Sequence, residues 1–404
     1  MMAANGDVLR WIDSQKETAL RLVTDWAHVN SFTQNVTGIE SLSKKVEAEF
    51  ASLGSAVTHH ELSPLESIDS SGNIQYSPLG RAIRFTKRPD APFRALLNIH
   101  LDTVYPPTSP FQKVSEIDSN TLRGPGVADA KGGLVVMLTA LRAFERSEQA
   151  SNLGWEVILN PDEEIGSPGS AGLLIEAARR NHFGLVYEPS LPDGSLVGAR
   201  KGSGNFVAVV RGRAAHAGRD FHLGRSAILA LSELIGRVDR LQHEFNGVTT
   251  NCGKIEGGGP LNMVPDLAIG RFNIRVTHPA DRARIEQRLA ELADELSSRE
   301  GISVKIHGAF HSPPKLVDAR SARLFEIVQS CGKEMGLDLQ IHASGGACDG
   351  NRLADVGLPV VDTLGPRGGH LHSEQEYIQI DSLTERAKLT IKILTHLANR
   401  GALD

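Results

Sequence analysis

The chain has 404 residues, of which 40% are hydrophobic and 23% are charged, and its formal net charge is −5. That length exceeds one ordinary hydrophobic core, so we expect two domains. The slightly acidic balance, without a Lys/Arg-rich stretch, argues against nucleic-acid binding, and no apolar run reaches the roughly 18 residues that a membrane span needs.

The cysteines and the first residues indicate the compartment. Cys252, Cys331 and Cys348 lie far apart and suit neither a disulfide framework nor a cysteine-based zinc site, which favours a reducing environment. The start of the chain lacks a basic stretch followed by an apolar one, so we expect no signal peptide. We therefore predict a cytoplasmic protein with no membrane partner.

Helical and strand-like patterns alternate in the first half of the chain. Apolar residues at helical spacing predict helices at residues 8–26, 39–53, 133–146 and 170–180. Apolar runs between them predict buried strands at residues 93–101, 155–160 and 183–187. Such alternation is typical of a doubly wound, mostly parallel sheet, in which ligands bind at the carboxyl ends of the strands.

The pattern changes near residue 204. Strands and helices are now predicted in the order β-α-β-β-α-β, which suggests a ferredoxin-like insert, with segments at residues 205–210, 226–241, 267–276, 280–298 and 302–309. The alternation of helices and strands then resumes, with helices predicted at residues 321–335 and 382–398 and strands at residues 339–342 and 359–363. We predict an α/β catalytic domain in two segments (residues 1–203 and 311–404), interrupted by a smaller α+β domain (residues 204–310).

Three acids, Asp162, Glu163 and Glu164, directly follow the predicted strand at 155–160. A run of acids most often forms a solvated loop. At the end of a buried strand, however, each unpaired carboxylate would cost several kcal/mol. We therefore expect a strongly positive partner among them.

Other strand ends and loops offer matching metal ligands. The candidates are His100, Asp129, Glu164, Glu188 and either His370 or His372. Imidazole and carboxylate without thiolate is the ligand set of a catalytic zinc ion. The set exceeds the needs of one tetrahedral ion, and two ions that share one bridging carboxylate would use all of it. Asp129 could instead cap the helix that follows it.

Asp102 stands two residues after His100, so both side chains point the same way along the strand. Its carboxylate could fix the tautomer of the imidazole.

Several motifs resemble the zinc metallopeptidase and deacylase family of glutamate carboxypeptidases, acetylornithine and succinyl-diaminopimelate deacetylases and aminoacylases. They occur at residues 100–104, 124–133, 162–167, 187–189, 215–218, 348–351 and 372–374. The similarity covers nearly the whole chain and is greatest to the glutamate carboxypeptidase branch.

The resemblance implies that Asp129 bridges two zinc ions and is followed by a cis peptide bond to Ala130. It assigns the other ligands in pairs, His100 with Glu188 and Glu164 with His372. The pattern favours His372 over His370 because the family's ligand precedes a small residue and an acid. Cobalt or manganese could replace zinc at such ligands.

The resemblance also implies roles for residues around the metals. Glu163 would be the general base, which takes a proton from a metal-activated water and passes it to the leaving amine. His216 would reach the active site of a partner subunit and stabilise the oxyanion, which implies a homodimer. Arg275 would bind a substrate carboxylate, Asn262 could donate to the same group, and the backbone of Gly346 would line the pocket.

Our hypothesis is therefore a di-zinc metallohydrolase that cleaves an amide or peptide bond next to a free carboxylate in a small N-acyl amino acid or peptide. A non-catalytic small-molecule binding protein on the same scaffold is an alternative, but it would need neither Glu163 nor a complete ligand set. A di-metal phosphoesterase is another. It predicts clustered basic residues near the metals, where Lys131, Arg200 and Lys201 are the only obvious ones.

Overall fold

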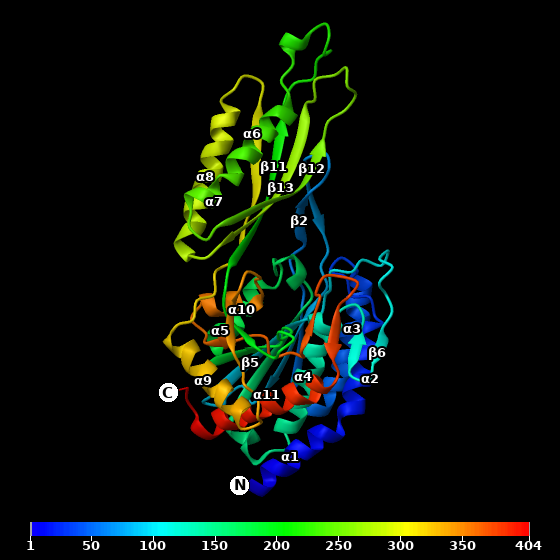
Figure 1. The fold of residues 1–404 in the computed structure, drawn as a ribbon, viewed down its shortest axis with the longest axis vertical. Coiled ribbons are helices and arrows are strands. Elements are labelled where there is room, and N and C mark those ends of the chain that lie inside the picture. The colour runs from blue at the N-terminus through cyan, green and yellow to red at the C-terminus, as the bar shows by residue number, and fades with distance from the viewer. Residues whose placement is uncertain (1, 404) are drawn as a thin grey trace.

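A mixed sheet and its helices form the lower part of the molecule in Figure 1, and a second sheet with its own helices forms the upper part. This structure is a computed structural model that describes residues 2–403, and side chains from residue 6 onward. Both ends of the chain lie in the lower part (Figure 1). No helix within the described residues is long and apolar enough to cross a membrane.

The sheet of the lower part has six strands in the order β1-β4-β8-β5-β9-β16. Their bounds are Ala56–His60 (β1), Ala82–Lys87 (β4), Gly154–Asn160 (β8), Arg94–His100 (β5), Phe183–Val186 (β9) and Val360–Val361 (β16). The four strands from β8 to β16 are parallel, as predicted. β4 pairs antiparallel with both β1 and β8, so the sheet is mixed, although β4 alone runs against the common direction of its strands.

Helices cover both faces of this sheet. The larger core lies on the face of Leu97 and Ile99, and the smaller one lies on the face of Leu96, because successive strand residues point to opposite faces. The helices of the larger core are α1 (Met2–Ser14), α2 (Lys16–Ala27), α3 (Val36–Phe50), α4 (Gly133–Phe144), α9 (Ala319–Lys333) and α11 (Asp381–Arg400). Those of the smaller core are α5 (Ala171–Arg180) and α10 (Asp349–Asp355).

The helix predicted at 8–26 is two helices, α1 and α2. The chain leaves helical geometry at Gln15, and this change of direction lets Ile12 before it and Leu22 after it pack in the same core. Periodicity alone did not reveal the break because the apolar spacing continues across it.

The upper sheet has the strand order β12-β13-β11-β14, and all neighbours in it are antiparallel. Its strands are β11 (Gly202–Arg211), β12 (Thr249–Gly257), β13 (Leu267–Val276) and β14 (Ser303–Ser312). The helices α6 (Ala227–Asp239) and α8 (Pro279–Ser297) pack on one face through a separate hydrophobic core, and the short α7 (Leu241–Glu244) follows α6. The predicted order includes a strand at the place of β12, but no bounds were predicted for it because it is a largely exposed edge strand without a clear apolar alternation.

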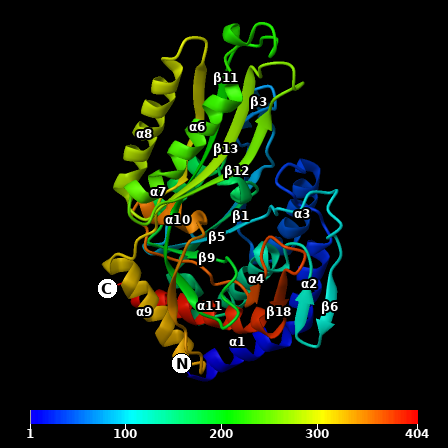
Figure 2. The same cartoon turned by 45° about the horizontal axis from the view of Figure 1, so that its top comes forward.

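A hairpin of β2 (Leu65–Ile68) and β3 (Ile74–Ser77) leaves the lower part and lies beside the upper sheet in both Figure 1 and Figure 2. Nη2 of Arg271 donates to the carbonyl of Ile68 (2.7 Å), and Nη2 of Arg211 donates to that of Ser71 (2.9 Å). At the tip, a Cβ on Gly72 would lie 2.6 Å from Cγ1 of Val209. The sequence did not predict this contact between residues 1–203 and the upper sheet.

Two small sheets complete the fold. One pairs β10 (Leu196–Arg200) with β15 (Ile341–Ser344). The other has the order β17-β18-β7-β6 and consists of β17 (Gly368–Gly369), β18 (Tyr377–Gln379), β7 (Thr121–Arg123) and β6 (Ser115–Asp118).

Candidate metal centre

Three parallel neighbours, β8, β5 and β9, end at the same edge of the lower sheet. His100 is the last residue of β5, and Glu188 follows β9 by two residues. Glu163 and Glu164 lie just after β8, in a loop of residues 162–167 that we call the acid loop. The order of the strands therefore gathers side chains from distant parts of the sequence at one place.

The five predicted ligands form two groups that share one residue. His100, Asp129 and Glu188 make the first group, and Asp129, Glu164 and His372 make the second; within each group the ligand atoms lie within 4.8 Å of one another. Oδ1 of Asp129 is 2.9 Å from Nε2 of His100, and Oδ2 is 3.2 Å from Nε2 of His372. Each oxygen of Asp129 thus faces a different group.

His370 does not belong to either group. The peptide bond from Asp129 to Ala130 is cis, as the resemblance implies.

Burial and neighbouring charges shift the pKa values of the side chains in both ligand groups. Burial raises the pKa of Glu188 to about 8 and that of Glu164 to about 7. Burial alone would lower the pKa of His100, but the carboxylates around it outweigh this effect and hold the pKa well above its ordinary value. The hydrogen bond to Asp129 raises the pKa of His372 to about 11.

The residues fit a pair of divalent cations. Each group offers one imidazole nitrogen and two carboxylates, a donor set that zinc, cobalt and manganese accept. Oε1 of Glu164 is buried and has no hydrogen-bond partner, which is costly unless a cation or a donor meets it.

Asp102 has a contact that the sequence did not reveal. Its buried carboxylate accepts hydrogen bonds from the backbone N–H groups of Glu163 (3.1 Å) and Glu164 (3.2 Å) and from the hydroxyl of Thr33 (2.6 Å). Nδ1 of His100 lies 3.0 Å from the backbone carbonyl of Asp102 and 3.4 Å from its Oδ1. Asp102 therefore fixes the acid loop to the end of β5, whereas its effect on the tautomer stays a prediction.

Asp162, the first residue of the acid run, belongs to neither ligand group. Its buried carboxylate accepts from the backbone N–H groups of Gly169 (2.7 Å) and Ser170 (3.1 Å), next to the start of α5. Uncharged N–H donors near a helix N-terminus, rather than the expected positive group, therefore meet the carboxylate of Asp162.

Glu376 is a residue that the sequence analysis missed. Its buried carboxylate accepts from the backbone N–H groups of Ala128 (2.9 Å) and Asp129 (3.0 Å), and from the hydroxyl of Tyr105 (2.6 Å). Burial raises its pKa to about 7. Glu376 holds the backbone of the shared ligand, a role for which no spacing or motif was available as a signal.

The predicted substrate residues separate into two places. Nη1 of Arg275 donates to the carbonyl of Gly345 (2.5 Å), so this arginine and Gly346 lie together where the upper sheet meets the lower part. His216 and Asn262 are adjacent through a hydrogen bond from the N–H of Ala217 to the carbonyl of Asn262 (2.8 Å). They lie past the far end of β11, and a ten-residue strand spans about 30 Å, so the structure does not bring them to the ligand groups of the same chain.

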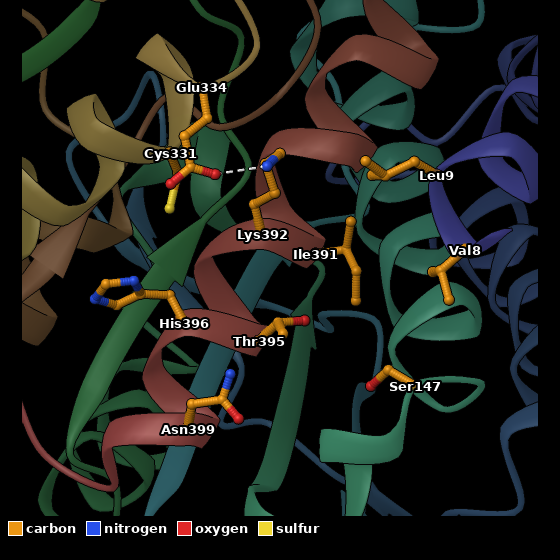
Figure 3. A pocket seen from close by; sticks show the side chains of 10 residues that line it. All are labelled: Val8, Leu9, Ser147, Cys331, Glu334, Ile391, Lys392, Thr395, His396 and Asn399. Atoms are coloured by element: carbon orange, nitrogen blue, oxygen red, sulfur yellow. Dashed lines mark hydrogen bonds and ion pairs between the residues drawn. The ribbon is translucent and has the colours of Figure 1, made fainter. Parts of the chain in front are cut away.

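A cavity of about 170 Å³ lies among α1, α9 and α11, and its lining includes no predicted metal ligand (Figure 3). Its lining includes Leu9, Cys331, Ile391 and the ion pair between Glu334 and Lys392 (2.7 Å). These two charged side chains therefore neutralise each other.

Comparison with known proteins decides the family. Residues 96–396 match the sequence model of peptidase family M20/M25/M40. The chain belongs to this family. The resemblance drawn from the motifs is confirmed, and this M20 protein is a metal-dependent hydrolase.

Two curated relatives illustrate the similarity. Carboxypeptidase G2 from Pseudomonas sp. (strain RS-16) is 26% identical over 386 residues, which cover 95% of this chain and 90% of the relative. A succinyl-diaminopimelate desuccinylase from Nitrosospira multiformis is 27% identical over 312 residues, which cover 72% of this chain and 79% of the relative.

Solved structures show the M20 fold. The dipeptidase Dug1p from Saccharomyces cerevisiae superposes with a TM-score of 0.77 over 99% of both chains, at 15% identity. The YXEP protein of Bacillus subtilis, described as a dinuclear metal-binding peptidase, gives a TM-score of 0.63 over 96% of this chain and 99% of that one, at 15% identity.

Proposed function

We propose that this M20 hydrolase cleaves an amide or peptide bond next to a free carboxylate, as a di-zinc carboxypeptidase or N-acyl-amino-acid amidohydrolase. The observation that carries the proposal is the place of Asp129, whose two oxygens face two separate ligand groups. The names of the two relatives, a carboxypeptidase and a desuccinylase, support the same class of bond.

In the proposed site, Asp129 holds both cations. His100 and Glu188 complete the first position, and Glu164 and His372 complete the second. When bound, such a pair of ions polarises a carbonyl group and lowers the pKa of a water molecule.

Glu163 is the proposed general base. It takes a proton from the attacking water and later delivers it to the leaving amine. Its neighbour Glu164 belongs to the second ligand group. The backbone N–H groups of Glu163 and Glu164 both donate to Asp102, so the backbone that carries the base is fixed. A base held in this way loses little entropy when the substrate reacts.

Arg275 is the proposed partner of the substrate carboxylate. Its Nε donates to Oδ1 of Asn273 (3.0 Å) and its Nη1 to Gly345, and these contacts orient the guanidinium group. Arg200 and Lys131, which a phosphoesterase would need, have other partners: Arg200 pairs with Asp362 (2.9 Å), and Nζ of Lys131 donates to the carbonyl of Val29 (2.9 Å). The structure therefore gives no support to phosphoester hydrolysis.

We further propose a homodimer in which residues 204–310 form the dimerisation domain and residues 1–203 with 311–404 form the catalytic domain. The edge strand β12 and the exposed Phe221 and Leu261 at the far end of the upper sheet support an interface there. In such a dimer, His216 would stabilise the oxyanion in the partner's site.

Two experiments test the chemistry. The zinc-reconstituted protein should hydrolyse members of a panel of N-acyl amino acids and dipeptides. Glu163→Gln should keep both metals but lose about 100- to 10,000-fold in kcat, the usual worth of a general base. Full turnover by this variant would remove Glu163 from the mechanism.

Hybrid dimers test the cross-subunit role of His216. His216→Ala and Glu163→Gln subunits, each inactive alone, should recover part of the activity when mixed, because one site of the hybrid has both groups. No recovery after demonstrated subunit exchange would count against this role.

A further inference from the structure

Arg352 joins the acid loop to the end of β14, a strand of the upper sheet. Its Nη2 donates to the carbonyl of Gly166 (2.9 Å) and to that of His311 (2.7 Å). Gly166 belongs to the acid loop, and His311 is the penultimate residue of β14. One guanidinium nitrogen thus connects two segments that are distant in the sequence.

His311 also touches the acid loop directly. A Cβ on Gly166 would lie only 2.3 Å from Nδ1 of His311, so the imidazole ring packs on the bare backbone of the glycine. Both ring nitrogens are buried and have no hydrogen-bond partner. Burying a polar ring without hydrogen-bond partners lowers the stability of the fold. The position of His311 is therefore not explained by a gain in stability.

The strands that connect the two parts of the molecule are residues 200–203 and 311–315, which we call the linker strands. They pair with each other through reciprocal backbone hydrogen bonds between Arg200 and Lys315 (3.0 Å each). Nδ2 of Asn351 donates to the carbonyls of Lys201 (3.0 Å) and Pro313 (2.8 Å), one on each linker strand.

Asp349, on the same turn of α10, binds the acid loop and the end of β8. Its carboxylate accepts hydrogen bonds from the hydroxyl of Ser167 in the acid loop and from the amide of Asn160 at the end of β8 (2.7 Å). In α10, Asp349 therefore binds the acid loop and Asn351 binds both linker strands. Arg352 binds the acid loop and one linker strand at the same time.

We propose that Arg352 and His311 are positioning residues for the general base: they couple the acid loop to a linker strand, so that the orientation of the upper sheet sets the position of Glu163. The inference rests on the proposed role of Glu163. In this arrangement a movement of β14 is transmitted to Gly166 by the ring of His311 and by the shared nitrogen of Arg352.

Substitution of Arg352 gives the first test. Arg352→Ala should retain both metals and a KM close to that of the wild type, but lose about 100-fold in kcat, as expected when a catalytic group is displaced by ~1 Å. Arg352→Lys, which keeps a donor, should recover part of that loss. Arg320→Ala is the matched control, because Arg320 also bonds two backbone carbonyls, those of Gly357 and His182, yet does not contact the acid loop. An unchanged kcat in Arg352→Ala would overturn the inference.

A double-mutant cycle tests the contact of His311. Gly166→Ala forces a Cβ into the imidazole, and His311→Ala removes the ring that it meets. The loss of kcat in the double variant should be smaller than the product of the two single losses, because the strain from the positive φ of Gly166 is the same with either residue at 311. Losses that simply multiply would contradict the coupling.

Hydrogen exchange separates this inference from the proposed function. In metal-free protein, the backbone amides of Gly166 and Ser167 bond within the acid loop and should exchange faster in Arg352→Ala than in wild type or Arg320→Ala. A wild-type protein that hydrolysed no amide would overturn the proposed function, and the exchange rates would still decide the coupling. Equal exchange rates would refute the coupling even in an active enzyme.

Discussion

His311 makes the stability of the protein depend on pH in the acidic range. Burial, together with the positive charges of Arg352 and Arg275, lowers the pKa of its imidazole from 6.5 to about 4. The unfolded chain therefore binds the proton at a higher pH than the folded one, and stability is lost as the pH falls through this interval. Linkage between these two pKa values gives a loss of about 2 kcal/mol between about pH 7 and pH 5.

Urea unfolding of metal-free wild type and His311→Gln at both pH values measures this loss. Glutamine keeps a polar side chain but does not titrate, so the difference between the two proteins removes the contributions of all other groups. The free energy of unfolding of the wild type should fall by about 2 kcal/mol more than that of the variant. The same pH dependence in both proteins would refute the reasoning.

Three substitutions extend the test to other contacts. Asp102→Asn turns the amide NH2 group toward one of the two N–H groups, of Glu163 or of Glu164, which donate to different oxygens of Asp102, so kcat should fall about 100-fold. Thr33→Val, which removes only the hydroxyl bond to the same carboxylate, should cost much less, and equal effects would contradict this role. Asp362→Asn leaves the cations of Arg200 and Lys315 without a buried counter-ion, and urea unfolding should show a loss of about 3–5 kcal/mol rather than an unchanged midpoint. Gly72→Ala should detach the hairpin tip from Val209 and speed its cleavage by protease, unlike Gly336→Ala, which has a similar positive φ and no neighbour within 4 Å.

The central strands of the lower sheet were predictable because they are buried on both faces. Every residue of β8 is buried, and so is every residue of β5 after Arg94, which gives largely apolar runs in the sequence, interrupted by Glu156 and Asn98. β12 and the β2–β3 hairpin were not predictable in this way. They are largely exposed and depend on pairing with neighbours, which leaves no apolar pattern.

The candidate ligands could be found from the sequence because parallel strands end at one edge of a sheet. His100 ends such a strand, and Glu164 and Glu188 follow two others, so their proximity could be expected from the predicted topology. The contacts of Asp102 and Glu376 could not be found in the same way. Both carboxylates accept hydrogen bonds from backbone N–H groups, whose directions are set only when the loops have folded.

The metal content of the purified protein tests the central claim most directly. After exposure to excess zinc and removal of free metal, elemental analysis should find two zinc ions per chain in the wild type. Asp129→Asn should lose zinc from both positions, because this residue belongs to both ligand groups. A wild-type chain that binds no zinc, or only one ion, would contradict the account.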